Sequence, residues 1–233
     1  MKDIIGQALL DYQNGNYSED ILTETNISEE DVLLLPYLFR GFSEMPSIEK
    51  KALELAKGKV LDVGCGAGSH SLYLQDKGLE VTAIDTSKGA IEVCKLRGVS
   101  DVREIDLLDL KDGKFDTILL LMNGTGIFQK LELIDAYLQQ LKSLLNPNGQ
   151  ILIDSSDLQY MYDSTAEGAI LVPSDRYYGE LEFVMKYKDE SSKPFKWLYL
   201  DESIFETAAS NCSLKFEILE RGENYDYLVK LSF

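Results

Sequence analysis

The residues best suited to chemistry lie in one stretch, positions 59–74, which reads KVLDVGCGAGSHSLYL. Asp62 interrupts a short apolar run, and three glycines then follow at alternate positions: Gly64, Gly66 and Gly68. Because glycine has no Cβ and accepts positive φ, a ligand can approach such a backbone closely. The apolar run predicts a strand, and the residues after the glycines predict a helix start with free N–H groups. The stretch therefore predicts a ligand cradle.

The spacing and charge of this stretch distinguish two kinds of nucleotide ligand. A dinucleotide-binding turn reads G-x-G-x-x-G, whereas here the pattern is G-x-G-x-G, and Ser69 occupies the last dinucleotide position. The Asp62 carboxylate would repel a pyrophosphate and attract the α-ammonium group of a methionine moiety. The segment 62–68, DVGCGAG, resembles the first motif of class I S-adenosylmethionine-dependent methyltransferases, (D/E)-x-G-x-G-x-G, at every fixed position. The structural alternative is a strand-to-helix turn without a ligand.

The resemblance implies further cofactor contacts along the chain. Asp85, which ends the predicted strand 80–85, would accept hydrogen bonds from two ribose hydroxyls, although it could instead cap the next helix. In this family an aspartate after the third strand accepts a hydrogen bond from the adenine amino group. Asp106 and the backbone of Leu107 match that position, with Asp109 as a competitor. The implied contacts for S-adenosylmethionine, or its product S-adenosylhomocysteine, are Arg40, Asp62, Gly64, Cys65, Gly66, Gly68, Asp85, Thr86, Asp106, Leu107 and Met122.

Methyl transfer makes modest demands on catalytic side chains. It is an in-line displacement at a sulfonium carbon with a neutral leaving group, so the protein chiefly supplies proximity and alignment. A base would help if the acceptor were a hydroxyl or a protonated amine. His70, the single histidine, and Asn123, after the predicted strand 115–121, are the candidates. Each has a structural alternative, because His70 could be a partly buried helix residue and Asn123 a turn residue.

The elements that must position these residues alternate between strand and helix patterns. The predicted strands occupy 60–63, 80–85, 102–106, 115–121, 150–154, 214–220 and 225–233. An amphipathic helix is expected at 131–145. By its resemblance to the family, the chain is expected to adopt an α/β, Rossmann-like fold with helices on both faces. Its seven-stranded, mostly parallel sheet would have the order 3214576 with the last strand antiparallel.

Two segments fall outside this alternation. Residues 1–57 predict an N-terminal helical lid, in which the aromatic segment 37–42 would line a pocket while Arg40 reaches the cofactor carboxylate. One lid helix is expected to begin at the N-cap Ser28 and to include the apolar run that precedes Pro36. The methyltransferase core is expected over 58–233. It would carry a β-hairpin insertion at about 156–200, a common place for substrate recognition in this family.

Composition limits the partners that can be expected. The chain has 233 residues and a formal net charge of −17 without a basic block, which disfavours nucleic-acid binding. Its three cysteines are far apart and it has one histidine, so no metal site is expected and the thiols should be reduced. No apolar run approaches the roughly 20 residues of a membrane span. We therefore expect a cytoplasmic protein that does not enter a membrane.

These observations favour a methyltransferase that uses S-adenosylmethionine and acts on a small molecule. A protein or RNA methyltransferase is an alternative, although the acidic charge and the absence of an N-P-P-Y motif disfavour a nucleic-acid substrate. A non-catalytic module that keeps the cofactor pocket is another alternative. An NAD-dependent dehydrogenase is disfavoured by Ser69 and Asp62.

Overall fold

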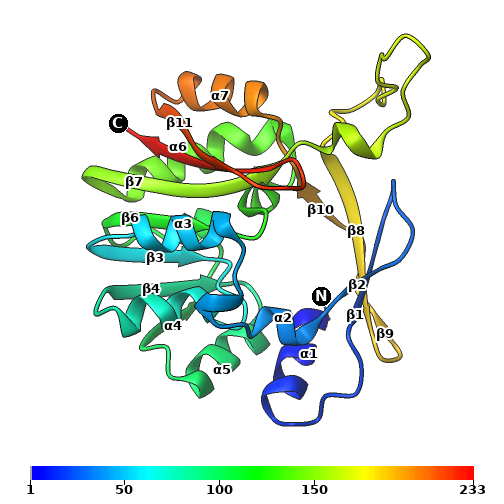
Figure 1. The fold of residues 1–233 in the computed structure, drawn as a ribbon. Coiled ribbons are helices and arrows are strands. Elements are labelled where there is room, and N and C mark those ends of the chain that lie inside the picture. The colour runs from blue at the N-terminus through cyan, green and yellow to red at the C-terminus, as the bar shows by residue number, and fades with distance from the viewer. Residues whose placement is uncertain (1) are drawn as a thin grey trace.

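The computed structural model describes residues 2–233, and its centre is a seven-stranded sheet (Figure 1). Its strands are β3 (Lys59–Val63), β4 (Glu80–Asp85), β5 (Asp101–Glu104), β6 (Phe115–Leu120), β7 (Leu145–Ser156), β11 (Lys215–Arg221) and β12 (Asp226–Ser232). The spatial order is β11-β12-β7-β6-β3-β4-β5. All neighbours from β5 to β7 are parallel, whereas β12 is antiparallel to both β7 and β11. This confirms the predicted order 3214576 with an antiparallel last strand.

Helices cover both faces of this sheet. They are α3 (Ser47–Leu55), α4 (Ser69–Asp76), α5 (Lys88–Arg97), α6 (Ile134–Leu144) and α7 (Glu202–Asn211). Val60 of β3 packs in the cluster that contains α3 and α4, whereas the next residue, Leu61, packs in the cluster that contains α6 and α7. Successive strand residues point to opposite faces, so an apolar run is required where both faces are buried. Helix α6 begins three residues later than expected, after a 3-10 turn at Leu131–Leu133.

A second, smaller sheet stands beside the carboxyl ends of the central strands (Figure 1). It contains β1 (Ile21–Thr25), β2 (Asp31–Leu33), β8 (Glu180–Tyr187), β9 (Glu190–Ser191) and β10 (Phe195–Leu198). The order is β10-β8-β1-β2, and β9 pairs with β8. The antiparallel pair of β8 and β10 is the expected hairpin insertion. Its partner strands β1 and β2 come from the N-terminal segment.

The prediction of a lid helix that begins at Ser28 is therefore wrong. The run after Ser28 forms strand β2, which pairs with β1, instead of a helix. Val32 and Leu34 are both exposed, so this apolar run has no helical face to bury. Pairing of β1 with β8, more than 150 residues away, holds the segment extended, and such a contact overrides local propensity.

Apart from β1 and β2, the regular elements of the N-terminal segment are helical. Helix α1 (Ile4–Gln13) lies across α5, and the two backbones touch at Gly6 and Gly89. A Cβ on Gly89 would lie 2.4 Å from the Gly6 carbonyl oxygen, so a side chain there would separate the helices. Asp3 caps α1 and accepts hydrogen bonds from Ser87 Oγ and the Gly89 N–H, each at 2.9 Å. Among residues 2–233, no helix is both long and apolar enough to cross a membrane.

Candidate functional site

The glycine loop between β3 and α4 has the backbone that its sequence predicts. Gly64, Gly66 and Gly68 have φ values of 73°, 53° and 81°, in the left-handed region that favours glycine. A Cβ on Gly66 would meet nothing within 4 Å, so the loop is open on that side. A Cβ on Gly68 would lie 2.9 Å from Cys94 Sγ, so the loop is tightly packed against α5.

Asp62 lies beneath this loop near the end of β3. Its side chain is buried, and Ser71 Oγ donates a hydrogen bond to Asp62 Oδ2 at 2.5 Å. Burial raises the pKa of Asp62, although nearby His70 and the bond from Ser71 oppose that rise. Asp62 therefore ties the first turn of α4 to β3, and its predicted contact with the methionine ammonium stays a prediction.

Asp85 connects the glycine loop to the start of α5. Asp85 Oδ2 accepts a hydrogen bond from the Gly66 N–H at 2.9 Å, and Oδ1 accepts one from the Ser87 N–H at 2.8 Å. The N-cap of α5 is Ser87, whose hydroxyl accepts from the Ala90 N–H, so Asp85 is not the cap. Burial raises the pKa of Asp85. Each carboxylate oxygen has a further lone pair for a ribose hydroxyl.

Asp106 follows β5, which ends at Glu104 instead of continuing to the aspartate. Asp106 caps a short 3-10 turn and accepts a hydrogen bond from the Leu108 N–H at 2.8 Å. The Ile105 N–H donates to the Asp85 carbonyl oxygen at 3.0 Å, so the predicted ribose and adenine positions share one edge of the sheet. Asp109 is exposed, whereas Asp106 is half-buried, and this difference favours Asp106 as the adenine contact.

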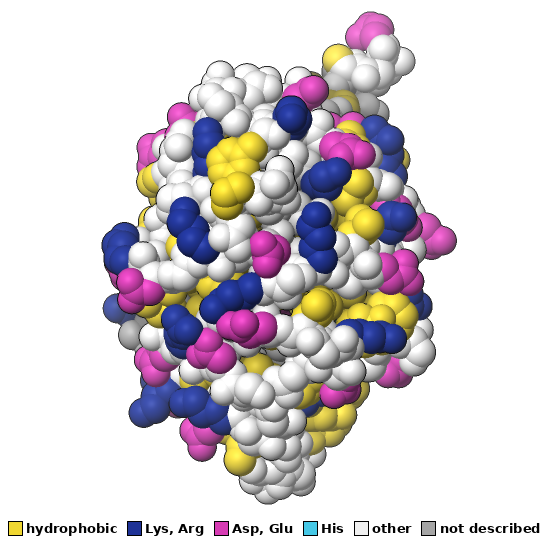
Figure 2. Space-filling model, turned by 90° about the vertical axis from the view of Figure 1, so that its left-hand side faces the viewer, with side chains coloured by type: hydrophobic (Ala, Val, Ile, Leu, Met, Phe, Trp, Pro, Cys, Tyr) yellow, Lys and Arg dark blue, Asp and Glu magenta, His cyan; other side chains and the backbone are white. Residues whose placement is uncertain are grey.

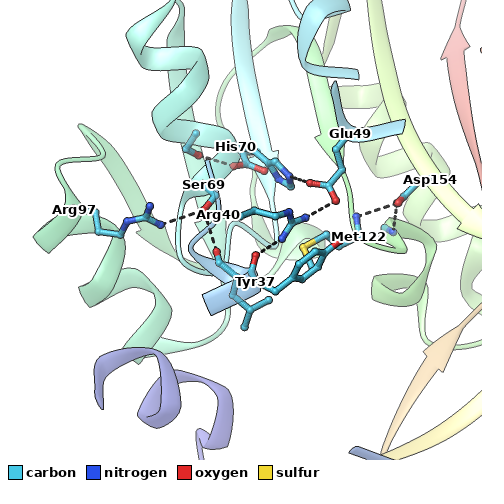
Figure 3. A network of polar contacts seen from close by, with 12 residues as sticks. Tyr37, Arg40, Glu49, Ser69, His70, Arg97, Met122 and Asp154 are labelled. Atoms are coloured by element: carbon cyan, nitrogen blue, oxygen red, sulfur yellow. Dashed lines mark hydrogen bonds and ion pairs between the residues drawn. The ribbon is translucent and has the colours of Figure 1, made fainter. Parts of the chain in front are cut away.

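A buried polar network joins the lid to the glycine-loop helix (Figure 3). His70 Nε2 lies 2.7 Å from Glu49 Oε2, and the other Glu49 oxygen forms an ion pair with Arg40. The guanidinium of Arg40 lies 3.7 Å from the ring centroid of Tyr37 and donates to the Tyr37 carbonyl oxygen. Burial alone would raise the pKa of Glu49, but His70 and Arg40 stabilise the carboxylate and lower it. Glu49 was missed from the sequence, where it is one of two acids in α3.

This network engages two residues, His70 and Arg40, that the sequence assigned to catalysis and to cofactor binding. His70 is 8% exposed and Arg40 is 5% exposed, and both are held by the same carboxylate. His70 is therefore held by the Glu49 carboxylate, and a catalytic role for it stays a prediction. Arg40 keeps one buried donor, Nε, without a partner among residues 2–233.

Further contacts attach the lid segment to the glycine loop. Ser69 Oγ donates to the Leu38 carbonyl oxygen at 3.0 Å (Figure 3). Arg97 on α5 donates to the Ala67 carbonyl oxygen at 2.6 Å and reaches the Phe39 carbonyl oxygen at 3.5 Å. Hydrogen bonds from Ser69 and Arg97 therefore hold the segment that includes α2 (Leu35–Leu38) against the glycine loop.

A strained loop follows β6 at the carboxyl edge of the sheet. Met122 and Asn123 have φ values of 67° and 60°, a conformation that costs of order 1–3 kcal/mol for each non-glycine residue. Asp154, at the end of β7, accepts hydrogen bonds from the Met122 N–H at 3.1 Å and the Gly124 N–H at 2.7 Å. Burial raises the pKa of Asp154 to about 6. The sequence placed Asp154 only as the end of a strand, and its role in holding this loop was missed.

The insertion hairpin docks on the same loop. Asn123 Nδ2 and Thr125 Oγ1 donate to the Leu198 carbonyl oxygen at 3.3 and 3.0 Å. Gly126 contacts Trp197 so closely that a Cβ would lie 1.9 Å from the indole ring. Asn123 is thus engaged with β10, and its Oδ1 is buried without a partner among the described residues.

Aromatic rings extend from this contact. The ring centroid of Phe183 lies 6.0 Å from that of Phe195 and 6.4 Å from that of Tyr199. Burial, together with the nearby Tyr160 and Asp154, raises the pKa of Tyr199 to about 12. We call Phe183, Phe195 and Tyr199 the aromatic wall. Next to Tyr199, the Leu200 N–H donates to Ser155 Oγ of β7 at 2.8 Å, so this wall adjoins the carboxyl end of β7.

Two surface hollows lie away from the glycine loop. One, of about 660 Å³, has an acidic lining that includes Asp157, Asp201 and Asp226, at the carboxyl end of β7 and the β11–β12 turn. The other, of about 290 Å³, lies between Lys57 and Phe233. Neither contains a glycine-loop residue, so the candidate site rests on the strand ends and not on these hollows. Among residues 2–233, no three His, Cys, Asp or Glu side chains gather to hold a metal ion.

Comparison with known proteins agrees with this geometry. Residues 54–202, more than half of the chain, match the family model described as a methyltransferase domain. The chain belongs to this family. A SAM-dependent methyltransferase from Bacteroides fragilis, solved in complex with S-adenosyl-L-homocysteine, is 41% identical, with a TM-score of 0.92 over 99% of this chain and 94% of that chain. The resemblance inferred from the glycine motif is thereby confirmed, as is its cofactor class.

More distant proteins share parts of the chain or the fold. Streptomyces venezuelae DesVI is 18% identical with a TM-score of 0.56, over 84% of this chain and 94% of that one, and shows the fold alone. The putative methyltransferase YqeM of Bacillus subtilis is 31% identical over 42% of each chain. A ubiquinone biosynthesis O-methyltransferase of Xanthomonas euvesicatoria is 31% identical over 44% of this chain and 45% of its own. The chain spans about half, or less, of the length of these curated relatives.

Proposed function

We propose that this methyltransferase transfers the methyl group of S-adenosylmethionine to a small-molecule acceptor by in-line displacement. The observation that carries the proposal is the link between Asp85 and the Gly66 N–H. It places a carboxylate beside an open glycine backbone, where a nucleoside with two ribose hydroxyls can be bound. The relative from Bacteroides fragilis, with its bound product, supports the same cofactor.

The cofactor contacts follow from the position of each predicted residue. The backbone from Gly64 to Gly68, including Cys65, would contact the methionine and ribose portions, and Met122 would lie on the methionine side. Asp85 and the exposed Thr86 would bind the ribose, while Asp106 and Leu107 would bind the adenine. Arg40 would turn part of its guanidinium from Glu49 to the cofactor carboxylate, and its unpartnered Nε supports that role.

The acceptor would lie between the loop after β6 and the aromatic wall. Both the lid and the insertion hairpin border this region, which supports a small molecule better than a polymer. Figure 2 shows the opposite side of the molecule, away from the second sheet, where acidic and basic side chains are interspersed without a continuous basic area. Nucleic acid is therefore a poor partner there. With His70 held by Glu49, catalysis would come mainly from alignment of the two reactants.

Isothermal titration of S-adenosylhomocysteine into the wild type and Asp85→Asn tests the cofactor site. The substitution places an amide group against the Gly66 and Ser87 N–H donors and removes the charge offered to the ribose. A lost hydrogen bond to a charged group contributes about 1.5–3 kcal/mol, so the Kd should rise about 10- to 100-fold. Asp112→Asn, at an exposed acid outside the predicted contacts, is the matched control and should leave the Kd unchanged. Equal affinity in wild type and Asp85→Asn would refute the ribose assignment.

Incubation with labelled S-adenosylmethionine and a metabolite extract tests transfer itself. Mass spectrometry should find the label in a small molecule. Label found only in added protein or RNA would favour those acceptors instead. Cofactor binding without any labelled product would favour a non-catalytic module.

The three free cysteines support the cytoplasmic location expected from the sequence, which fractionation of cells can test.

A further inference from the structure

Two cysteines meet behind the glycine loop, and the proposed reaction uses neither thiol. Cys65 stands in the loop between Gly64 and Gly66, and Cys94 lies on α5. Their sulfur atoms are 3.7 Å apart, and the Cys94 thiol donates to the Gly66 carbonyl oxygen at 3.3 Å. Both thiols are free and buried. The loop that receives the cofactor thus rests on a pair of thiols in contact.

The packing around the pair determines which side can move. Cys94 Sγ is confined by the loop, because a Cβ on Gly68 would lie only 2.9 Å from it. By contrast, a Cβ on Gly66, next to Cys65, would meet nothing within 4 Å. A disulfide requires a sulfur separation of about 2.05 Å, so the bond would draw Cys65 and its glycine neighbours toward α5. It would also remove the thiol hydrogen now donated to the Gly66 carbonyl oxygen.

We propose that Cys65 and Cys94 form a disulfide when the protein meets a peroxide, and that this bond weakens binding of the adenosyl cofactor. The peroxide first oxidises one thiol to a sulfenic acid with release of water. The second thiol then displaces hydroxide from that sulfur, forming the S–S bond and a second water. In total, the two thiols lose two protons and two electrons, and one peroxide is reduced to two waters. The bond forms independently of methyl transfer, whereas its effect on affinity rests on the proposed cofactor site.

Burial of the two thiols limits the rate at which peroxide oxidises them. The adjacent Cys94 thiol and burial together raise the pKa of Cys65, so little thiolate is present at neutral pH. Oxidation is therefore slow and requires the glycine loop to open. A cofactor bound on the loop opposes that opening, so the cofactor-free protein reacts faster than the loaded one.

The test treats the full chain with hydrogen peroxide, with and without S-adenosylhomocysteine, and follows intact mass and peptide maps. The expected result is a mass loss of about 2 Da and a peptide linking Cys65 to Cys94, formed faster without the ligand. Titration of S-adenosylhomocysteine should show a Kd raised about tenfold or more after oxidation and restored by dithiothreitol. Cys94→Ala should form no linked peptide. Cys212→Ser, at a buried cysteine remote from the loop, should respond like the wild type.

The outcomes separate the two claims. Absence of the linked peptide, or a mass gain from sulfinic acid at Cys65 instead, would overturn the disulfide. A disulfide that leaves the Kd unchanged would overturn its effect on the cofactor. If the reduced protein bound no S-adenosylhomocysteine at all, the proposed cofactor site would fail, while the peptide map would still decide whether the two cysteines join.

Discussion

At the scale of single residues, similar carboxylates acquire different tasks from their surroundings. Asp62 holds the first turn of α4, Asp85 joins the glycine loop to α5, and Asp154 holds the loop after β6. Asp62 and Asp85 could be singled out because they occupy fixed positions around a glycine motif, but the sequence predicted cofactor contacts for them and not these bonds to Ser71 and Gly66. Asp154 and Glu49 could not, because their partners come from distant segments that the sequence does not place beside them.

The pH dependence of stability in wild type and Asp154→Asn tests whether burial raises the pKa of Asp154. Burial raises the folded-state pKa of Asp154 from 3.8 to about 6, so between these values the folded protein binds the proton more tightly than the unfolded chain. Its contribution to stability is therefore greatest below pH 4 and is lost as pH rises through 6. The shift of about two units corresponds to roughly 3 kcal/mol.

Thermal unfolding of the wild type and Asp154→Asn at pH 4 and pH 7 measures this effect. The asparagine variant lacks the titration, so the wild type should lose stability relative to the variant as pH rises. Asp109→Asn, at an exposed acid, should show no such difference. A stability difference between wild type and Asp154→Asn that stays constant across this range would contradict the raised pKa.

At the scale of elements, side-chain networks fasten the lid and the insertion to the core. The glycine loop could be predicted from its own residues, since the required φ values are local. The attachment of the lid could not, because Glu49 on α3 looks like its neighbouring acids until His70 and Arg40 are placed beside it. Likewise, only the packing of β10 on the loop after β6 explains why Gly126 lacks a side chain.

Glu49→Gln tests the attachment of the lid to α4. The substitution leaves the buried Arg40 charge without its carboxylate, and breaking a buried pair from one side costs about 3–5 kcal/mol. Denaturant unfolding should show a loss of that order. Glu54→Gln lies on the same helix at an exposed position and should change stability by less than about 0.5 kcal/mol. Similar losses in the two variants would show that the network does not stabilise the lid.

Gly126→Ala tests the docking of the insertion hairpin. The added methyl would overlap the Trp197 ring, so β10 must shift, and overpacking of this kind costs about 1–3 kcal/mol. Melting of the variant, followed by tryptophan fluorescence, should show lower stability and a more exposed indole. Gly41→Ala is the control, because φ there is −84° and the nearest atom to its Cβ would be 3.9 Å away. An unchanged fluorescence spectrum in Gly126→Ala would argue against the close contact.

At the scale of the whole molecule, the central sheet could be predicted and the second sheet only in part. The central strands could be predicted from local patterns, and their order from the resemblance to the family, even though the connection from β7 to β11 contains the insertion and α7. Strand β8 was expected from its alternation, but its pairing with β1 joins residues such as Leu22 and Lys186. The local sequence patterns of β1 and β8 do not indicate that these strands pair. Without that pairing, β2 was expected to be part of a helix.

The charge of the whole molecule leads to a further prediction. Aspartate and glutamate number 40 against 23 lysines and arginines, so the folded chain repels itself even though opposite charges are interspersed in Figure 2. Exposed ion pairs such as Lys130–Glu132 contribute little, whereas net repulsion acts over the whole surface. Raising sodium chloride from about 0.01 M to 0.15 M shortens the screening length from about 30 Å to 8 Å. Because this weakens repulsion across the molecule more than pairing across a few ångströms, the melting temperature should rise. A melting temperature that fell with salt would show instead that the surface ion pairs outweigh the excess of negative charge.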